Sequence, residues 1–306
     1  MNPEPAIAAP TGLPPARRMT VLALSAAAAV AVALLLAACS PIGALNALTP
    51  SDTYRATRDV PYGRSPRQRL DVYTPVSAAP AGGWPMVVFF YGGSWTSGNR
   101  ADYKFVGEAL AERGVLTLVA DYRLYPQVRY PDFLRDSAEA TAWGLVHATR
   151  LGGDPKRVFV MGHSAGGYNA AMLALDARWL RDAGQRPAEL AGWIGLAGAY
   201  EFLPLGPSSP ARPVFFHPDY PPGTQPIDYA RPGALPAFLA APVNDKVVSP
   251  ERSTLAMAAR LRAAGVPVEL HMYEGVSHAL LAGAFARPLR GVAPVLDDVA
   301  RWIDAH

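Results

Sequence analysis

From about residue 86 to its end, the chain alternates short apolar runs with longer stretches of helical periodicity. Most of these runs are continuously apolar rather than alternating, which is typical of parallel strands covered on both faces. They predict strands at residues 86–90, 115–119, 158–160, 193–196, 237–240 and 268–272.

Between these strands, apolar positions recur at the spacing of a helix. One such face runs through residues 134–145 and another through residues 295–303. Ser249-Pro250 is typical of a helix start, and Gly265 of the end of the same helix. Residues 54–60 and 70–73 flank a turn-rich segment and predict an antiparallel pair. The pattern therefore predicts an α/β fold with a mainly parallel sheet flanked by helices.

Residues 201–236 depart from this alternation, because they are rich in proline and aromatic residues. A structureless stretch of that length inside a compact domain is usually functional. We expect a short partial cap over a site. A passive surface excursion is the alternative.

Composition narrows the class of protein. The 306 residues are about half apolar, enough for one large domain or two small ones, and the formal net charge is only +3. Arginines are scattered and no basic run occurs, so the sequence does not predict nucleic-acid binding.

The N-terminus has the features of a targeting segment. Arg17-Arg18 precedes an apolar run at residues 21–38, which is typical of a secretory signal peptide. The run ends in Leu36-Ala37-Ala38-Cys39, which resembles the lipobox of bacterial lipoproteins, so Cys39 is the expected lipidation site. We expect a signal peptide at residues 1–38, a lipid-anchor tether at 39–53 and one folded domain at 54–306. The alternatives are an uncleaved membrane anchor or a signal peptide cleaved elsewhere.

The strongest chemical motif is Gly162-His163-Ser164-Ala165-Gly166, which fits the Gly-x-Ser-x-Gly pattern of a nucleophile elbow. A predicted strand precedes it and an alanine-rich helical stretch follows, which is the context that this chemistry requires. Ser164 is therefore the candidate nucleophile.

A serine nucleophile needs a histidine base and a carboxylate that orients the histidine. Four histidines follow Ser164, namely His217, His271, His278 and His306. His278 is favoured, because it lies in a loop leaving the last strand at the same sheet edge as the elbow. Asp245 follows the preceding strand and is favoured as the acid. The alternatives Asp219 and Asp228 lie in the proline-rich excursion.

Acyl transfer also needs amide donors for the developing oxyanion. Ala165, directly after Ser164, is one expected donor. Tyr91-Gly92-Gly93-Ser94-Trp95 follows the strand at residues 86–90, and the amides of Gly92 or Gly93 are expected to supply another.

Six segments together resemble the α/β-hydrolase superfamily, on its esterase branch near hormone-sensitive-lipase-like, kynurenine-formamidase-like and feruloyl-esterase-like enzymes. They are residues 68–73, 91–95, 121–124, 162–167, 245–248 and 277–278. The resemblance implies Ser164 as nucleophile, His278 as base, Asp245 as acid and an oxyanion hole from Gly92, Gly93 and Ala165. Two departures stand out. Tyr91 replaces the family's histidine and is expected to support the loop through its hydroxyl. Ala241-Pro242 replaces His-Gly before the acid, which predicts a different course for that loop.

These features predict a lipid-anchored serine hydrolase of the bacterial cell envelope, a carboxylesterase that needs no metal or organic cofactor. Its partners would be a small ester substrate and the membrane. An amidase, formamidase or peptidase with the same triad is the first alternative, and a non-catalytic hydrolase-fold binding protein is the second. The sequence leaves the substrate and the oligomeric state open.

Overall fold

Within residues 41–306, eight strands form one sheet, in the order β1-β2-β4-β3-β5-β6-β7-β8. β1 pairs with β2, and β2 with β4, in antiparallel fashion, and every other pair is parallel. The strands are β1 (Tyr54–Pro61), β2 (Arg69–Pro75), β3 (Trp84–Phe90), β4 (Leu116–Ala120), β5 (Gly153–His163), β6 (Gly192–Leu196), β7 (Ala237–Pro242) and β8 (Val268–Tyr273). The predicted antiparallel pair and all six predicted parallel strands are confirmed.

This computed structural model describes residues 41–306, and the predictions for the signal peptide and for Cys39 lie outside that range. The chain divides into two units, Met1–Ala47 and Leu48–His306. The described part of the first unit is the helix α2 (Pro41–Ala47). Within residues 41–306, no helix has both the length and the apolar character needed to cross a membrane.

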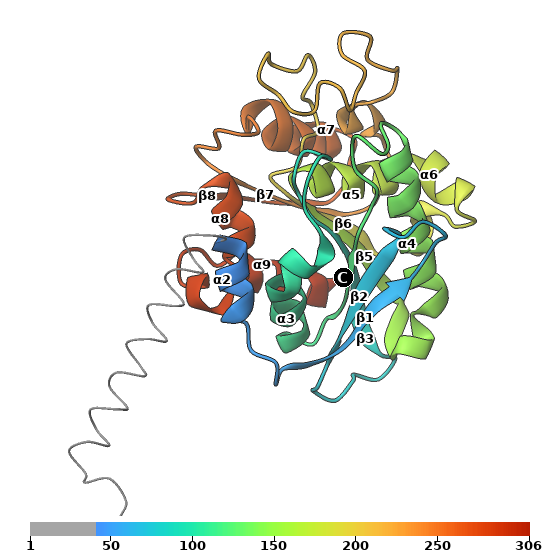
Figure 1. Cartoon of the computed structure of the whole chain (residues 1–306), viewed down its shortest axis with the longest axis vertical. Helices are drawn as coiled ribbons and strands as arrows, with labels where there is room; N and C mark the ends of the chain where they lie inside the picture. The colour runs from blue at the N-terminus through green and yellow to red at the C-terminus, as the bar shows by residue number, and fades with distance from the viewer. Residues whose placement is uncertain (1–40) are drawn as a thin grey trace, which may run out of the picture. The chain divides into compact units, whose positions relative to one another are not determined.

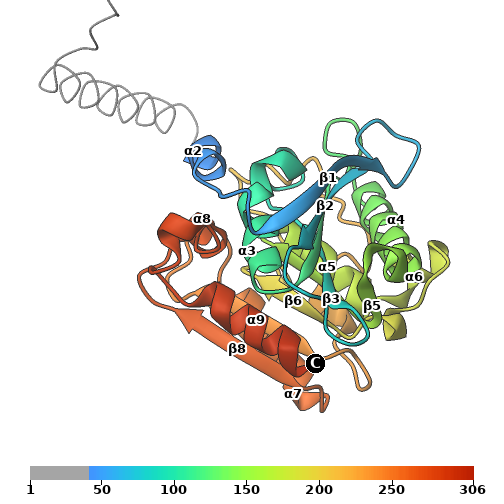
Figure 2. The same cartoon turned by 90° about the horizontal axis from the view of Figure 1, so that it is seen from below.

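Helices cover both faces of the sheet in the second unit. Figure 2 shows α3 and α9 on one side, with α4 and α6 on the other. The α-helices of this unit are α3 (Lys104–Glu112), α4 (Asp132–His147), α5 (Ala165–Leu175), α6 (Ala177–Asp182), α7 (Ala256–Ala263), α8 (His278–Gly283) and α9 (Val295–Ala305). Shorter helical turns are η1 (Arg100–Tyr103), η2 (Thr149–Leu151), η3 (Pro187–Glu189), η4 (Pro226–Tyr229), η5 (Glu251–Leu255) and η6 (Arg287–Leu289).

Burial on both faces explains the continuous apolar runs. Every residue of β4, β6 and β7 is buried. On one face, the Trp302 ring of α9 packs against Phe159 of β5 and Phe238 of β7, with ring centroids 5.6 and 6.1 Å apart. Burying one large apolar side chain contributes about 1.5–3 kcal/mol. The α9 periodicity seen in the sequence is thus the stripe that faces the sheet.

The parallel strands end at a common edge, and their following loops gather there. Gly92 follows β3, Ser164 follows β5 and Asp245 follows β7 at this edge, and His278 follows β8 at the start of α8. Residues 201–236 form loops beyond β6, drawn in yellow to orange at the top of Figure 1. Two sequence expectations need correction. The excursion is not wholly structureless, because it contains η4, and His278 is the first residue of α8 rather than a loop residue.

Candidate active site

Ser164 lies at the junction of β5 and α5 with a left-handed backbone, at φ 55° and ψ −118°. Glycine is required at positions 162 and 166, because backbone atoms approach both closely. A Cβ at Gly166 would lie 1.9 Å from the carbonyl oxygen of Phe90, and one at Gly162 would lie 2.1 Å from that of Gly166. The Ser164 amide donates to the Leu196 carbonyl at 2.9 Å, which ties the turn to β6. The predicted elbow geometry is therefore present.

His278 and Asp245 form a hydrogen-bonded pair. His278 Nδ1 lies 2.6 Å from Asp245 Oδ2, and the Asp245 side chain is fully buried. Its other oxygen accepts from the amides of Val247 and Val248, at 2.8 and 3.2 Å. Burial alone would raise the pKa of Asp245, but the bond from His278 and these two amides outweigh it, so the pKa is lowered. The carboxylate is thus charged, and it holds the proton of His278 on Nδ1.

With Nδ1 protonated, Nε2 of His278 is an acceptor. This atom is buried, and no group in residues 41–306 hydrogen-bonds to it. The structure brings Asp245 and His278 into contact and places Ser164 at the end of β5 on the same sheet edge, without a hydrogen bond from Ser164 to His278. Such bonds are often long in the absence of substrate and tighten when it binds.

The other candidate histidines have different partners. Nδ1 of His217 bonds to the Tyr220 hydroxyl at 2.6 Å, inside the proline-rich excursion. Nε2 of His271 lies 2.7 Å from Glu269 on the same strand. Among the described histidines, His278 alone pairs with the predicted acid, so the structure favours it over these two.

Residues 91–95, which we call the donor loop, lie directly beside Ser164. A Cβ at Gly92 would lie 3.0 Å from the Ser164 Cβ, so a larger residue would crowd the serine. Gly93, Ser94 and Trp95 all have positive φ, at 119°, 52° and 59°. On the other side of Ser164, Ala165 begins α5, where unpaired amides and the helix dipole favour negative charge.

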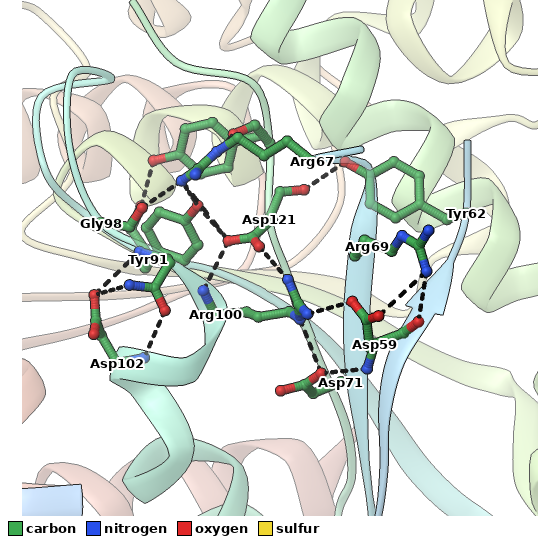
Figure 3. Close-up of polar contacts among 12 residues, drawn as sticks. Asp59, Tyr62, Arg67, Arg69, Asp71, Tyr91, Gly98, Arg100, Asp102 and Asp121 are labelled. Atoms are coloured by element: carbon green, nitrogen blue, oxygen red, sulfur yellow. Dashed lines mark hydrogen bonds and ion pairs between the residues drawn. The ribbon is translucent and has the colours of Figure 1, made fainter. Parts of the chain in front are cut away.

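Tyr91 anchors the donor loop through its hydroxyl (Figure 3). The hydroxyl donates to Asp121 Oδ1 at 2.7 Å and accepts from Arg67 Nη2 at 2.9 Å. Burial, with Tyr122 and Asp121 nearby, raises the pKa of Tyr91 well above its usual value, so the hydroxyl keeps its proton. The Tyr122 hydroxyl donates to the Tyr91 carbonyl at 2.7 Å. Tyr91 therefore supports the loop in the way that the sequence predicted.

Charged side chains extend this support away from the site, as Figure 3 shows. Asp121 accepts from the Arg100 amide at 2.7 Å and pairs with the Arg100 guanidinium. Arg100 also bonds to Asp71 at 2.9 Å and to Asp59 at 2.6 Å. Arg67 donates to the carbonyls of Tyr122 and Gly98. We call Arg67, Tyr91, Arg100 and Asp121 the anchor network.

A cleft of about 430 Å³ opens beside Ser164. Its walls come from the donor loop, the start of α5, residues 247–252 and residues 201–211 of the excursion. Trp95 joins the excursion to the body of the protein, because its ring lies 4.8 Å from Phe215 and its indole N–H donates to Asn169 at 3.0 Å. The excursion thus forms a wall of the cleft, as a partial cap does.

Two features escaped the sequence prediction. Arg67 supports the donor loop from a position outside the six matching segments, and Asp121 lies in the segment at residues 121–124, to which the sequence assigned no role. His163 occupies the variable position between the glycine and the serine of the Gly-x-Ser-x-Gly pattern, and its ring bonds to the main chain of His278. In the sequence alone, a histidine next to the candidate serine gives no indication of this contact.

The family model BD-FAE matches residues 70–186, which include the donor loop and the elbow. A probable isoprenylcysteine alpha-carbonyl methylesterase of Arabidopsis thaliana is 27% identical over 256 residues, covering 76% of this chain and 52% of the relative. Esterase LipC of Mycobacterium tuberculosis is 32% identical over 170 residues, covering 53% of this chain and 41% of the relative. The chain thus spans about half or less of these curated relatives.

Solved structures agree on the fold. An esterase of Pyrobaculum calidifontis superposes with a TM-score of 0.69 at 22% identity, covering 90% of this chain and 92% of that one. An esterase of Thermogutta terrifontis gives a TM-score of 0.66 at 24% identity, covering 83% and 94%. With the sheet order and the elbow geometry described above, these likenesses show that the chain has the α/β-hydrolase fold, and its sequence is similar to those of esterases.

Proposed function

We propose that this protein is a serine carboxylesterase in which Ser164 attacks the ester carbonyl, His278 is the general base and Asp245 orients His278. The observation that carries the proposal is the 2.6 Å bond between His278 and a buried, charged Asp245, at the sheet edge that holds the strained Ser164. The esterase names of its relatives support the reaction class.

The proposed reaction has two steps. His278 Nε2 takes the proton of Ser164 as its oxygen adds to the carbonyl carbon, and returns that proton to the departing alcohol. This leaves an acyl group on Ser164. Water then gives a proton to the same nitrogen and adds to the acyl carbon, and the carboxylic acid leaves as Ser164 regains its proton. In both steps the amides of Ala165 and of Gly92 or Gly93 would stabilise the oxyanion.

Mutation of Ser164 tests this proposal. We expect Ser164→Ala to reduce the kcat on a short p-nitrophenyl ester by at least about 10³-fold, since residual catalysis then rests on binding and the oxyanion donors. A fluorophosphonate probe should label the wild type and not the variant. Full activity in Ser164→Ala would exclude the mechanism. A wild type that neither hydrolyses esters nor reacts with the probe would favour a non-catalytic binding protein.

An amidase or peptidase would use the same residues, because the acyl-enzyme chemistry is shared and the pocket selects the substrate. Rates measured on ester and amide substrates with identical acyl groups distinguish the two reactions. We expect the ester to be preferred. A higher kcat/KM for the amide would assign the site to amide hydrolysis.

We further propose that the mature protein is exported and anchored to the bacterial envelope through a lipid on Cys39. The proposal rests on the sequence Leu36-Ala37-Ala38-Cys39 after an apolar run. Mass spectrometry of the mature N-terminus tests it, with a diacylglycerol adduct on Cys39 as the expected result. An unmodified N-terminus at any other residue would exclude lipid anchoring.

A further inference from the structure

His163 lies between the glycine and the serine of the elbow and has no part in the proposed mechanism. The residue is 5% exposed. Burial, together with the neighbouring His278, lowers its pKa to about 3, so the imidazole is neutral at ordinary pH. A neutral imidazole has one N–H donor and one acceptor nitrogen. The nitrogen that carries this proton determines which group the side chain can donate a hydrogen bond to.

The hydrogen bonds of His163 fix the position of its proton. Its Nε2 lies 2.9 Å from the backbone carbonyl oxygen of His278. A carbonyl oxygen only accepts, so Nε2 carries the hydrogen and donates it. Nδ1 is then an acceptor, and it is buried without a hydrogen-bond partner in residues 41–306. His163 thus makes a single directional contact, to the main chain of His278.

The two ends of this contact lie in different elements, one within the sheet and one at the start of a short helix. His163 is the last residue of β5 and pairs with Leu196 inside the sheet. His278 starts the six-residue helix α8 near the sheet edge, and the bond from His163 reaches it across 115 residues of sequence. The two imidazole rings lie 4.8 Å apart. The sheet interior therefore holds the main chain from which the His278 side chain projects.

His163 also borders the donor loop. A Cβ at Gly92 would lie 3.1 Å from His163 Nδ1. The ring consequently fills the space between the loop that would supply oxyanion donors and the residue that would supply the base. The His163 side chain therefore borders both the donor loop and His278.

We propose that His163 is a positioning residue, which holds the backbone of His278 so that its ring lies at the correct distance from Ser164. The inference rests on the proposed function of Ser164 and His278. Asp245 fixes the orientation of the ring, and His163 fixes the point from which the ring extends. A misplacement of about 1 Å in such an arrangement lowers a rate by up to about 10²-fold.

Two substitutions of similar length separate donation from packing. In His163→Gln, the amide nitrogen is the same number of bonds from Cα as Nε2 and can donate to the same carbonyl. His163→Met has similar length and no donor. We expect His163→Met to lower kcat about 10- to 100-fold with KM changed less than about threefold. We expect His163→Gln to recover most of kcat, with similar Tm values for both variants.

A spectroscopic readout makes the test independent of substrate. The proton shared by His278 Nδ1 and Asp245 should give a low-field proton NMR signal in the wild type. We expect the signal to persist in His163→Gln and to broaden or shift in His163→Met. If the wild type hydrolyses no ester, the proposed function fails and this signal still tests the positioning.

Equal kcat values for the Met and Gln variants would overturn the inference, whether both are normal or both are reduced. A fall in kcat that follows Tm in both variants would also overturn it, because the role would then be structural. Should His163→Met not fold, His163→Asn replaces it, since its amide is too short to reach the His278 carbonyl. Asn must then behave like Met, and recovery by Asn would contradict the proposal.

Discussion

The donor loop and His278 lie on either side of Ser164 and are held by different means. Tyr91 of the donor loop is fixed by the charged anchor network, in which Asp121 meets both Arg67 and Arg100. His278 is held by Asp245 at its ring and by His163 at its main chain. On the donor-loop side, several contacts hold the same segment, so the others remain when one is removed. On the His278 side, each contact fixes a different part of the residue, one the ring and the other the main chain.

This difference predicts that loss of one group costs more activity on the His278 side. The donor-loop side should instead respond mainly in stability, because its charges are partly buried and depend on one another. The following substitutions test the contrast, from the largest expected effect to the smallest.

Asp245→Asn should have the largest effect on activity. The amide no longer stabilises a protonated His278 and favours the wrong tautomer, so we expect kcat to fall by about 10³- to 10⁴-fold. Steady-state kinetics on a short p-nitrophenyl ester measures the effect. Asp219→Asn is the control, since Asp219 is the exposed alternative acid of the excursion, and its kcat should stay within about twofold. Equal losses in both variants would contradict the assignment of Asp245.

Asp121→Asn should have the largest effect on stability. It leaves Arg100 and Arg67 without this carboxylate, and we expect the free energy of unfolding to fall by about 2–3 kcal/mol. The arginine side chains are 20% and 28% exposed, and water moderates the loss. Urea unfolding provides the measurement, and kcat should fall only about tenfold. Asp132→Asn, which breaks an exposed pair with Arg135, should cost less than about 0.5 kcal/mol.

Tyr91→Phe should have a moderate effect. It removes the hydrogen bonds of the Tyr91 hydroxyl to Asp121 and from Arg67 and leaves the remaining contacts of the loop. We therefore expect the free energy of unfolding to fall by about 1–2 kcal/mol and kcat to be three- to tenfold lower. Tyr273→Phe is a matched control, because the Tyr273 hydroxyl donates to buried Asp298, also at 2.7 Å. It should lower stability similarly and leave kcat within about twofold. A kcat in Tyr91→Phe equal to that of the control would show that Tyr91 does not position the donor loop.

The smallest effect concerns acid stability on the His278 side. The pKa of His163 is lowered to about 3 in the folded protein, against about 6.5 in the unfolded chain. The unfolded chain therefore binds more protons between these values, and stability falls as pH falls through this window. Between pH 6.5 and 5.5 the wild type should lose about 1 kcal/mol more than His163→Gln. Parallel curves from thermal melts of the two proteins would contradict a buried, neutral His163.

The sequence predicted the sheet and the elbow because both depend on local signals. Apolar runs indicated each parallel strand. Gly162 and Gly166 indicated a tight turn around Ser164, in which neither glycine position has room for a side chain. The pairing of Asp245 with His278 followed from strand order, since both follow strands ending at one edge. Element boundaries depend on capping contacts that the apolar pattern does not show, and α8 begins at His278 because the Ser277 side chain caps it.

The anchor network could not be predicted in the same way. Arg67 and Tyr91 are 24 residues apart, and their contact depends on how a loop crosses the end of the sheet. The donor role of His163 likewise follows from burial and from the position of a distant carbonyl, which a single sequence does not encode in any local pattern. Contacts of this kind arise from tertiary packing, so they become visible only in the three-dimensional structure.

The left-handed backbone of Ser164 separates selection for activity from selection for stability. A residue with a Cβ at φ 55° is strained by about 1–3 kcal/mol, and glycine at this position would relieve much of that strain. Under the proposed function, glycine would also remove the nucleophile. A lineage that no longer needed ester hydrolysis would therefore gain stability by replacing this serine with glycine. Selection for stability would favour that replacement wherever selection for activity is relaxed.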